Sequence, residues 1–149
     1  MWHENQEKER QNSIVTVCGQ TRNAYGQLAA SYSIHGLGKD SNGTRRAFAH
    51  QVDEAAGATS DSKLAKLLKS QSADTSGYAD AVERNDKTAV QRYTVPSQSS
   101  AQALLDYCRA KASIDVYWAD SIGRRNTLII EVFDGTTGRV DYGADGASG

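Results

Sequence analysis

The clearest pattern in the chain is a stripe of apolar residues that recurs with the period of an α-helix. Its members stand at i, i+3, i+4, i+7 and i+11: Ala101, Leu104, Leu105, Cys108 and Ala112. This spacing places them all on one helix face, which must be buried against another element. Serines in residues 97–100 are typical of a helix N-terminus. We therefore predict a helix over residues 98–112 and a fold that covers its apolar face.

Two further segments have helical spacing. In residues 44–56, Thr44 is suited to be an N-cap and Gly57 to follow the last turn. The apolar positions of that segment are Ala47, Phe48, Val52, Ala55 and Ala56. In residues 61–70, Leu64, Leu67 and Leu68 form a narrow stripe after the capping candidates Asp61 and Ser62. A weaker helical pattern covers residues 77–86.

Other segments are typical of strands. Residues 14–18 are mostly β-branched, and residues 89–95 end at Pro96. Residues 114–118, 127–134 and 139–142 alternate or pair as strands do. Residues 25–35 also alternate, through Leu28, Ala30, Tyr32 and Ile34, although Tyr25, Leu28, Ala29 and Tyr32 equally fit one helix face. A strand pairing with residues 14–18 is favoured for this segment.

Together these elements predict an α+β fold. We expect a single domain over residues 13–142, with a mostly antiparallel sheet packed by about three helices. Residues 1–12 are polar and charged and are expected to form a flexible N-terminal arm or a short exposed helix. Residues 143–149 are expected to be a disordered tail.

Composition excludes several classes of protein. The 149 residues include 17 basic and 18 acidic side chains, which give a net charge of −1. This balance disfavours a dedicated binder of the phosphate backbone. No apolar run is long enough to span a bilayer, so no membrane partner is expected. The charged N-terminus does not resemble a secretory signal. A cytoplasmic location is therefore the expectation.

Cysteine and histidine suggest one enzymatic alternative. Cys18 with His35 could form the nucleophile and base of a hydrolase, and an aspartate such as Asp53 could orient the imidazole. Cys108 lies on the apolar stripe and is predicted to be core. A Cys18–Cys108 disulfide is not expected, because cytoplasmic proteins keep their thiols reduced. No spacing of histidines and cysteines suits a metal, so neither a metal site nor a cofactor is predicted.

Basic residues suggest a second alternative. They occur as two arginine pairs and along one flank of the helix predicted at 61–70. A nucleic-acid-binding or nuclease-type domain would use them to contact phosphates. The candidate residues are Arg45, Arg46, Lys63, Lys66, Arg124 and Arg125.

The C-terminal strands suggest the leading function. Tyr117, Ile129 and Phe133 point away from the apolar face of those strands, with Glu131 beside them. An apolar spot with an acidic rim suits a contact with another protein. The preferred interpretation is thus a small protein-binding module without catalytic activity, such as an inhibitor, adaptor or accessory subunit. Exposed edge strands at 14–18 and 139–142 would also allow a homo-oligomer.

Overall fold

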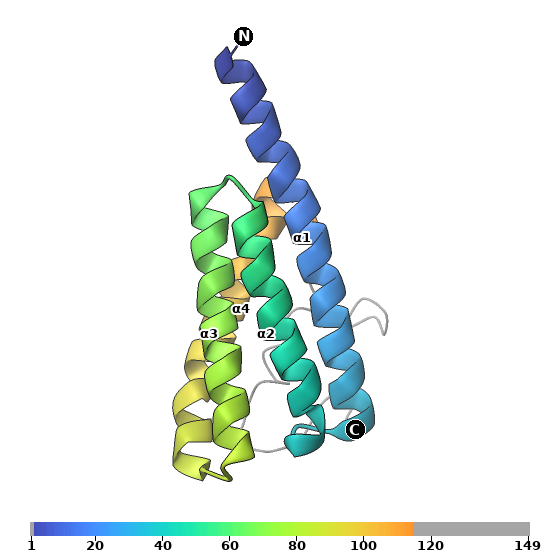
Figure 1. Ribbon diagram of the computed structural model, residues 1–149, viewed down its shortest axis with the longest axis vertical. Helices are drawn as coiled ribbons and strands as arrows, with labels where there is room; N and C mark the ends of the chain where they lie inside the picture. The colour runs from blue at the N-terminus through green and yellow to red at the C-terminus, as the bar shows by residue number, and fades with distance from the viewer. Residues whose placement is uncertain (1, 115–149) are drawn as a thin grey trace.

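The computed structural model describes residues 2–114, and every element in that part of the chain is helical (Figure 1). The chain forms α1 (Trp2–His35), a short 3-10 helix η1 (Lys39–Ser41), α2 (Asn42–Ala58), α3 (Ser62–Glu83) and α4 (Lys87–Ala112). The predicted α+β class is wrong for these residues, because no sheet occurs among them. Short connections make each helix antiparallel to the one before it.

Both strands predicted before residue 36 lie inside α1. The β-branched run 14–18 suggests a strand, but Ile14, Val17 and Cys18 are buried on one helix face while Val15 and Thr16 are exposed. β-Branching lowers helix propensity only slightly, and burial of the apolar face outweighs it. The edge strand proposed at 14–18 for a homo-oligomer is therefore absent.

The ambiguity at residues 25–35 is resolved in favour of the helix. Alternation would bury Ala30 and Ile34 together with Leu28 and Tyr32, yet Ala30 is exposed and Ile34 is 74% exposed. The helical set that includes Tyr25, Leu28 and Tyr32 is buried. The helix ends where Gly36 adopts a φ of 82°, which favours glycine, and donates to the Tyr32 carbonyl at 2.9 Å.

The strand predicted over residues 89–95 is wrong as well. These residues form the first turns of α4, and Pro96 lies within that helix. A proline inside a helix removes one backbone donor but does not always end the helix. The N-terminus of α4 is capped by Asp86, whose carboxylate accepts from the Ala89 N–H at 3.0 Å.

The helices predicted from apolar spacing are confirmed. Residues 44–56 lie in α2, residues 61–70 begin α3, and residues 98–112 form the second half of α4. The weak pattern at 77–86 is the continuation of α3 to Glu83 rather than a separate helix. The strands predicted at 114–118, 127–134 and 139–142 lie essentially outside the described residues, as does the predicted tail.

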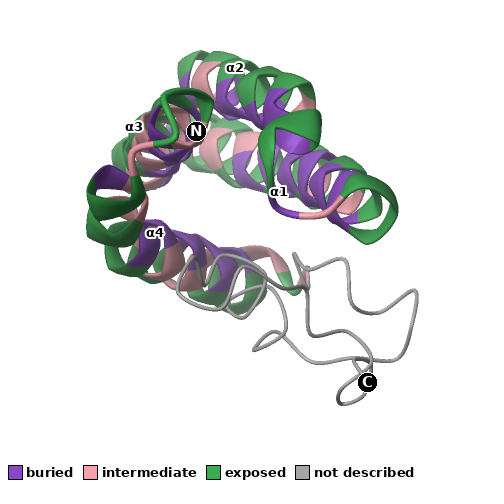
Figure 2. Ribbon diagram, turned by 90° about the horizontal axis from the view of Figure 1, so that it is seen from below, coloured by how far each residue is buried: buried purple, intermediate pink, exposed green. Residues whose placement is uncertain are grey.

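The buried faces of the four helices meet in one interior, as the inward-facing purple ribbon in Figure 2 indicates. Near the disulfide, that interior is apolar and includes Ile14, Leu64, Leu68, Leu104 and Leu105. Toward the opposite end, it contains polar side chains that bond to other side chains or to main-chain carbonyls. They include Tyr25, Gln71, Thr94, Ser97 and Arg45.

The N-terminal end of α1 projects beyond the other helices (Figure 1). Residues 2–9 are exposed on every side, and Trp2 is 65% exposed. The segment expected as an arm or a short exposed helix thus forms the first turns of α1.

Candidate functional site

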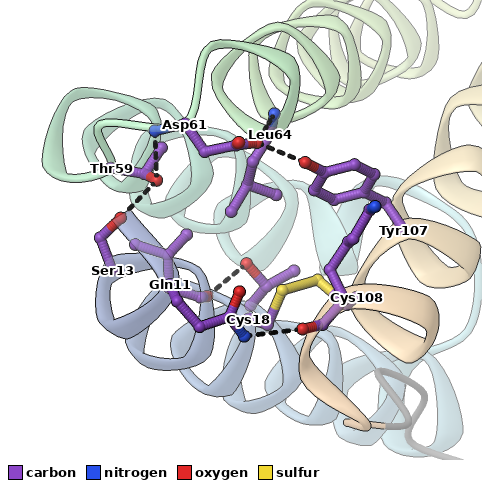
Figure 3. The surroundings of a disulfide bond; sticks show 11 residues. Gln11, Ser13, Cys18, Thr59, Asp61, Leu64, Tyr107 and Cys108 are labelled. Carbon is purple, nitrogen blue, oxygen red and sulfur yellow. Dashed lines mark hydrogen bonds between the residues drawn. A yellow bond between two sulfur atoms is a disulfide. The ribbon is translucent and has the colours of Figure 1, made fainter. Parts of the chain in front are cut away.

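A disulfide joins α1 to α4. Cys18 and Cys108 are both fully buried, with their Cα atoms 5.7 Å apart, although 90 positions separate them in the chain (Figure 3). The prediction that this bond would not form is therefore wrong. The proximity is not visible in the sequence, because α2 and α3 lie between the two cysteines in the chain and these meet only when α4 returns alongside α1.

The disulfide also removes the nucleophile of the proposed hydrolase. Cys18 presents no thiol, and His35 is 17 residues further along the same helix, about 25 Å away at 1.5 Å per residue. Asp53 lies on α2 and pairs with Lys69 at 2.8 Å. The structure thus does not bring Cys18, His35 and Asp53 together.

Asp61 lies near the disulfide and points toward Tyr107 of α4 (Figure 3), and its hydrogen bonds connect three helices. Its carboxylate caps α3 by accepting from the Leu64 N–H at 2.9 Å. It also accepts from the Tyr107 hydroxyl of α4 at 2.6 Å and from Arg10 of α1 at 2.5 Å. Each partner comes from a different helix, so this buried carboxylate holds the end of the bundle together.

These contacts shift the pKa values of Asp61 and Tyr107. Burial alone would raise the pKa of Asp61, but its hydrogen-bond donors outweigh burial and hold that pKa below the ordinary value. Burial, together with the bond to the Asp61 carboxylate, raises the pKa of Tyr107 to about 12. Asp61 is therefore ionised and Tyr107 is protonated at neutral pH, which suits a structural hydrogen bond.

Arg45, a candidate for contact with phosphate, is completely buried. Its guanidinium donates to the Tyr32 hydroxyl at 3.1 Å, to Asn42 Oδ1 at 2.7 Å, and to the carbonyls of Gly38 (2.9 Å) and Leu37. Its Cζ also lies 5.0 Å from the ring centroids of Tyr32 and Tyr78. Arg45 therefore fastens the α1–α2 connection and is not presented to a ligand.

The remaining basic candidates do not form one patch. Arg46 pairs with Asp80 at 2.9 Å near the far end of α3. Lys63 and Lys66 are exposed in the first turns of that helix, about 20–25 Å away along its axis. Arg124 and Arg125 lie outside the described residues. So do Tyr117, Ile129, Glu131 and Phe133, the residues predicted to bind a partner protein.

A groove between α1 and α2 is the candidate site that emerges from the structure. The groove is open to solvent and has a volume of about 370 Å³. Its walls carry Gln20, Asn23, Gln27, Gln51 and Glu54, and its small side chains include Ala24, Ala55 and Ala58. The groove thus combines small apolar groups with several amide side chains.

Regular spacing on both helices builds this α1–α2 groove. Gln20, Asn23 and Gln27 stand at i, i+3 and i+7 of α1, and Gln51, Glu54 and Ala58 repeat that spacing on α2. Positions three, four or seven apart share one helix face. The pattern is visible in the sequence, but it indicates a common face only after residues 14–35 are assigned to a helix.

The polar groups of the groove make few contacts with one another. Gln51 Nε2 donates to Gln27 Oε1 at 3.4 Å, a long hydrogen bond. Glu54 lies 3.4 Å from His50 Nε2, and both side chains are largely exposed. The Thr21 hydroxyl is satisfied by the Val17 carbonyl at 2.8 Å. The amides are therefore available to a ligand.

Within residues 2–114, no group of three or more histidine, cysteine or acidic side chains could hold a metal ion. None of the helices in this part of the chain combines the length and apolar character needed to cross a bilayer. Comparison of the chain with protein-family models, curated proteins and solved structures found no match. The class supported by the geometry is a disulfide-linked four-helix protein, in its described part, with an amide-lined groove.

Proposed function

We propose that the protein is a small protein-binding module without catalytic activity of its own, acting as an inhibitor, adaptor or accessory subunit. The α1–α2 groove is the observation that carries this proposal. Its amides offer hydrogen-bond donors and acceptors above small apolar side chains, which is the composition of a polar protein contact.

The chemistry of the lining favours binding over catalysis. Amide side chains form hydrogen bonds but do not exchange protons at neutral pH. Glu54 is the ionisable residue of the groove wall, and it is exposed beside an exposed histidine. General acid–base catalysis usually relies on a side chain held in a fixed position beside the reacting group, and an exposed carboxylate at a groove wall is not held in this way.

The disulfide supports a location different from the cytoplasmic one expected from the sequence. Buried structural disulfides form and persist in oxidising compartments. Cys18 and Cys108 are both fully buried and already paired. We therefore propose that the module works in an oxidising compartment. Acid-quenched alkylation of the protein in its own cells tests this location, and free thiols at both positions would contradict it.

The test of the function is a site-specific cross-link from the groove. A benzophenone amino acid replaces Gln20, and the labelled protein is irradiated in an extract of the cells that produce it. A partner protein should be captured, and mass spectrometry should place the link at residue 20. The Ala58→Phe variant fills one end of the groove at an exposed position and should abolish the capture.

Ala103→Phe provides the matched control, because Ala103 is also an exposed helical alanine but lies on α4. It should leave the capture intact. Equal loss with both variants, or equal capture by a benzophenone placed at Ala103, would contradict binding in the groove. Absence of any captured protein at residue 20 would contradict the proposal itself.

A further inference from the structure

The length of the amide row limits what the groove can accommodate. Gln20 and Gln27 are seven residues apart on α1, which corresponds to about 10 Å along the helix axis. An extended polypeptide advances about 3.3 Å per residue. The row is therefore as long as about three extended residues.

The chemistry of the row matches a polypeptide main chain. Each carboxamide has N–H donors and a carbonyl acceptor, as the peptide group does. A chain lying between the helices would displace the long bond of 3.4 Å between Gln51 and Gln27, and the amides of both helices could then pair with its alternating N–H and C=O groups. A partner helix has no such groups to offer, because its main chain is already hydrogen-bonded internally.

The small side chains of the groove allow that close approach. Ala24 and Ala55 end at Cβ, so a main chain can come within hydrogen-bond distance of the surrounding amides. A helix about 10 Å wide binds instead through a continuous apolar surface and large anchor residues. Amide side chains interrupt such a surface here.

Glu54 adds a preference for charge. Gln27 of α1 lies opposite Gln51 of α2, and the two helices run antiparallel. Glu54, three residues after Gln51, therefore lies near the level of Asn23, which precedes Gln27 on α1. Its carboxylate stands beside the middle of the amide row. The neighbouring ionisable group, His50, lies 3.4 Å from it. A basic side chain at the middle of the bound segment would therefore be favoured.

We infer that the α1–α2 groove binds an extended segment of about three residues of a partner protein, through its main chain and with a basic residue beside Glu54. This inference rests on the proposed function and names the form of the partner. Recognition through the main chain makes the groove tolerant of the side chains on either side of the basic residue.

The experiment follows the side-chain amide NMR signals of the ¹⁵N-labelled protein. The probe is alanyl-lysyl-alanine, acetylated at one end and amidated at the other. Signals of Gln20, Asn23, Gln27 and Gln51 should shift together and saturate. Gln102 and Gln11 serve as internal controls, because their amides bond to Asp106 and to the Lys111 carbonyl and lie outside the groove. Their signals should not follow the titration.

Two comparisons define the mode of binding. Methylating the main-chain nitrogens of the probe should weaken binding about five- to tenfold for each hydrogen bond lost. Replacing lysine by glutamate in the probe should weaken binding to the wild type. The Glu54→Gln variant should bind the two probes almost equally, which assigns the charge preference to this carboxylate.

The possible outcomes distinguish failure of extended-chain binding from failure of the proposed protein-binding function. Equal affinity for the methylated and unmethylated probes, or no shifts in the groove, would overturn extended-chain binding. A cross-link from residue 20 would still support the protein-binding function in that event. Saturable peptide binding without any captured partner would support the chemistry of the groove and contradict the function proposed for it.

Discussion

The Tyr107 hydroxyl lies 2.6 Å from the Asp61 carboxylate, which joins the last helix of the described chain to the start of α3 across 46 positions of sequence. The same carboxylate caps α3 and accepts from Arg10. One buried acid therefore links α1, α3 and α4 close to the disulfide. Because of this arrangement, the stability of the bundle should fall at both acidic and alkaline pH.

On the acidic side, stability should fall as Asp61 becomes protonated. The folded-state pKa of Asp61 is below its ordinary value of 3.8, so the unfolded chain takes up the proton first. The stabilisation is present above the unfolded pKa and is lost as the pH falls through the folded one. Asp61→Asn keeps a capping side chain but should lower the free energy of unfolding at neutral pH by about 1–3 kcal/mol.

Urea unfolding at a series of acidic pH values checks this prediction. The difference between wild type and Asp61→Asn should shrink as the pH falls below about 4. A difference that is independent of pH would show that the charge of Asp61 contributes nothing to stability.

At alkaline pH, the direction in which the folding stability changes is determined by Tyr107. Its pKa of about 12 in the folded protein lies above the ordinary value of 10.0. Stability from this group is therefore complete below pH 10 and is lost as the pH rises through 12. Tyr107→Phe should cost about 1 kcal/mol at neutral pH and should flatten the alkaline loss relative to wild type. Identical alkaline profiles for the two proteins would argue against the hydrogen bond.

The helices of this fold were predictable where apolar residues follow one period. The stripes in residues 44–56, 61–70 and 98–112 belong to helices as expected. In α1, by contrast, the apolar residues fit both the two-residue period of a strand and the 3.6-residue period of a helix. Leu28 and Tyr32 fit both the alternating and the helical pattern, and the exposure of Ala30 and Ile34 distinguishes the two. Local propensity cannot decide such a segment, because the deciding energy comes from its packing on α2 and α4.

The candidate site was less predictable than the fold. The groove requires side chains of α1 and α2 to face one another, and that depends on how two helices pack. The disulfide is equally non-local, since Cys18 and Cys108 meet only after three helix reversals. The burial of Arg45 among its hydrogen-bond partners was also not predictable from local sequence. Its sequence neighbour Arg46 is exposed, and nothing local tells the two arginines apart.

That contrast between neighbouring arginines predicts different costs for their removal. Arg45→Lys keeps the charge but cannot supply the same set of donors, so buried acceptors lose their partners. We expect a loss of about 2–4 kcal/mol in the free energy of unfolding. Arg46→Lys changes only an exposed pair with Asp80 and should cost less than about 1 kcal/mol. Equal costs for the two variants in urea unfolding would contradict this account.

The disulfide should contribute a large part of the stability of the bundle. α1 packs less extensively on α4 than on α2, and the bond closes that weaker contact. A loop of 90 residues restricts the unfolded chain strongly, which predicts a loss of about 3–5 kcal/mol on reduction. Hydrogen exchange in the reduced protein should lose protection in α1 before α2 and α3. The double variant Cys18→Ala/Cys108→Ala should reproduce both effects, and uniform loss of protection would contradict selective release of α1.

The close packing of α3 on α4 predicts that the effect of Gly77→Ala on stability depends on the side chain at position 93. A Cβ at Gly77 would overlap the ring of Tyr93, which covers this position from α4. In the wild type, Gly77→Ala should therefore gain little or destabilise the protein, despite the better helix propensity of alanine. In a Tyr93→Ala background, the overlap is absent, and the same substitution should stabilise by about 1 kcal/mol. Thermal or urea unfolding of the four proteins measures the coupling. A gain of about 1 kcal/mol from Gly77→Ala in both backgrounds would mean that the tyrosine ring moves away at no cost, so that this contact does not define how α3 and α4 approach.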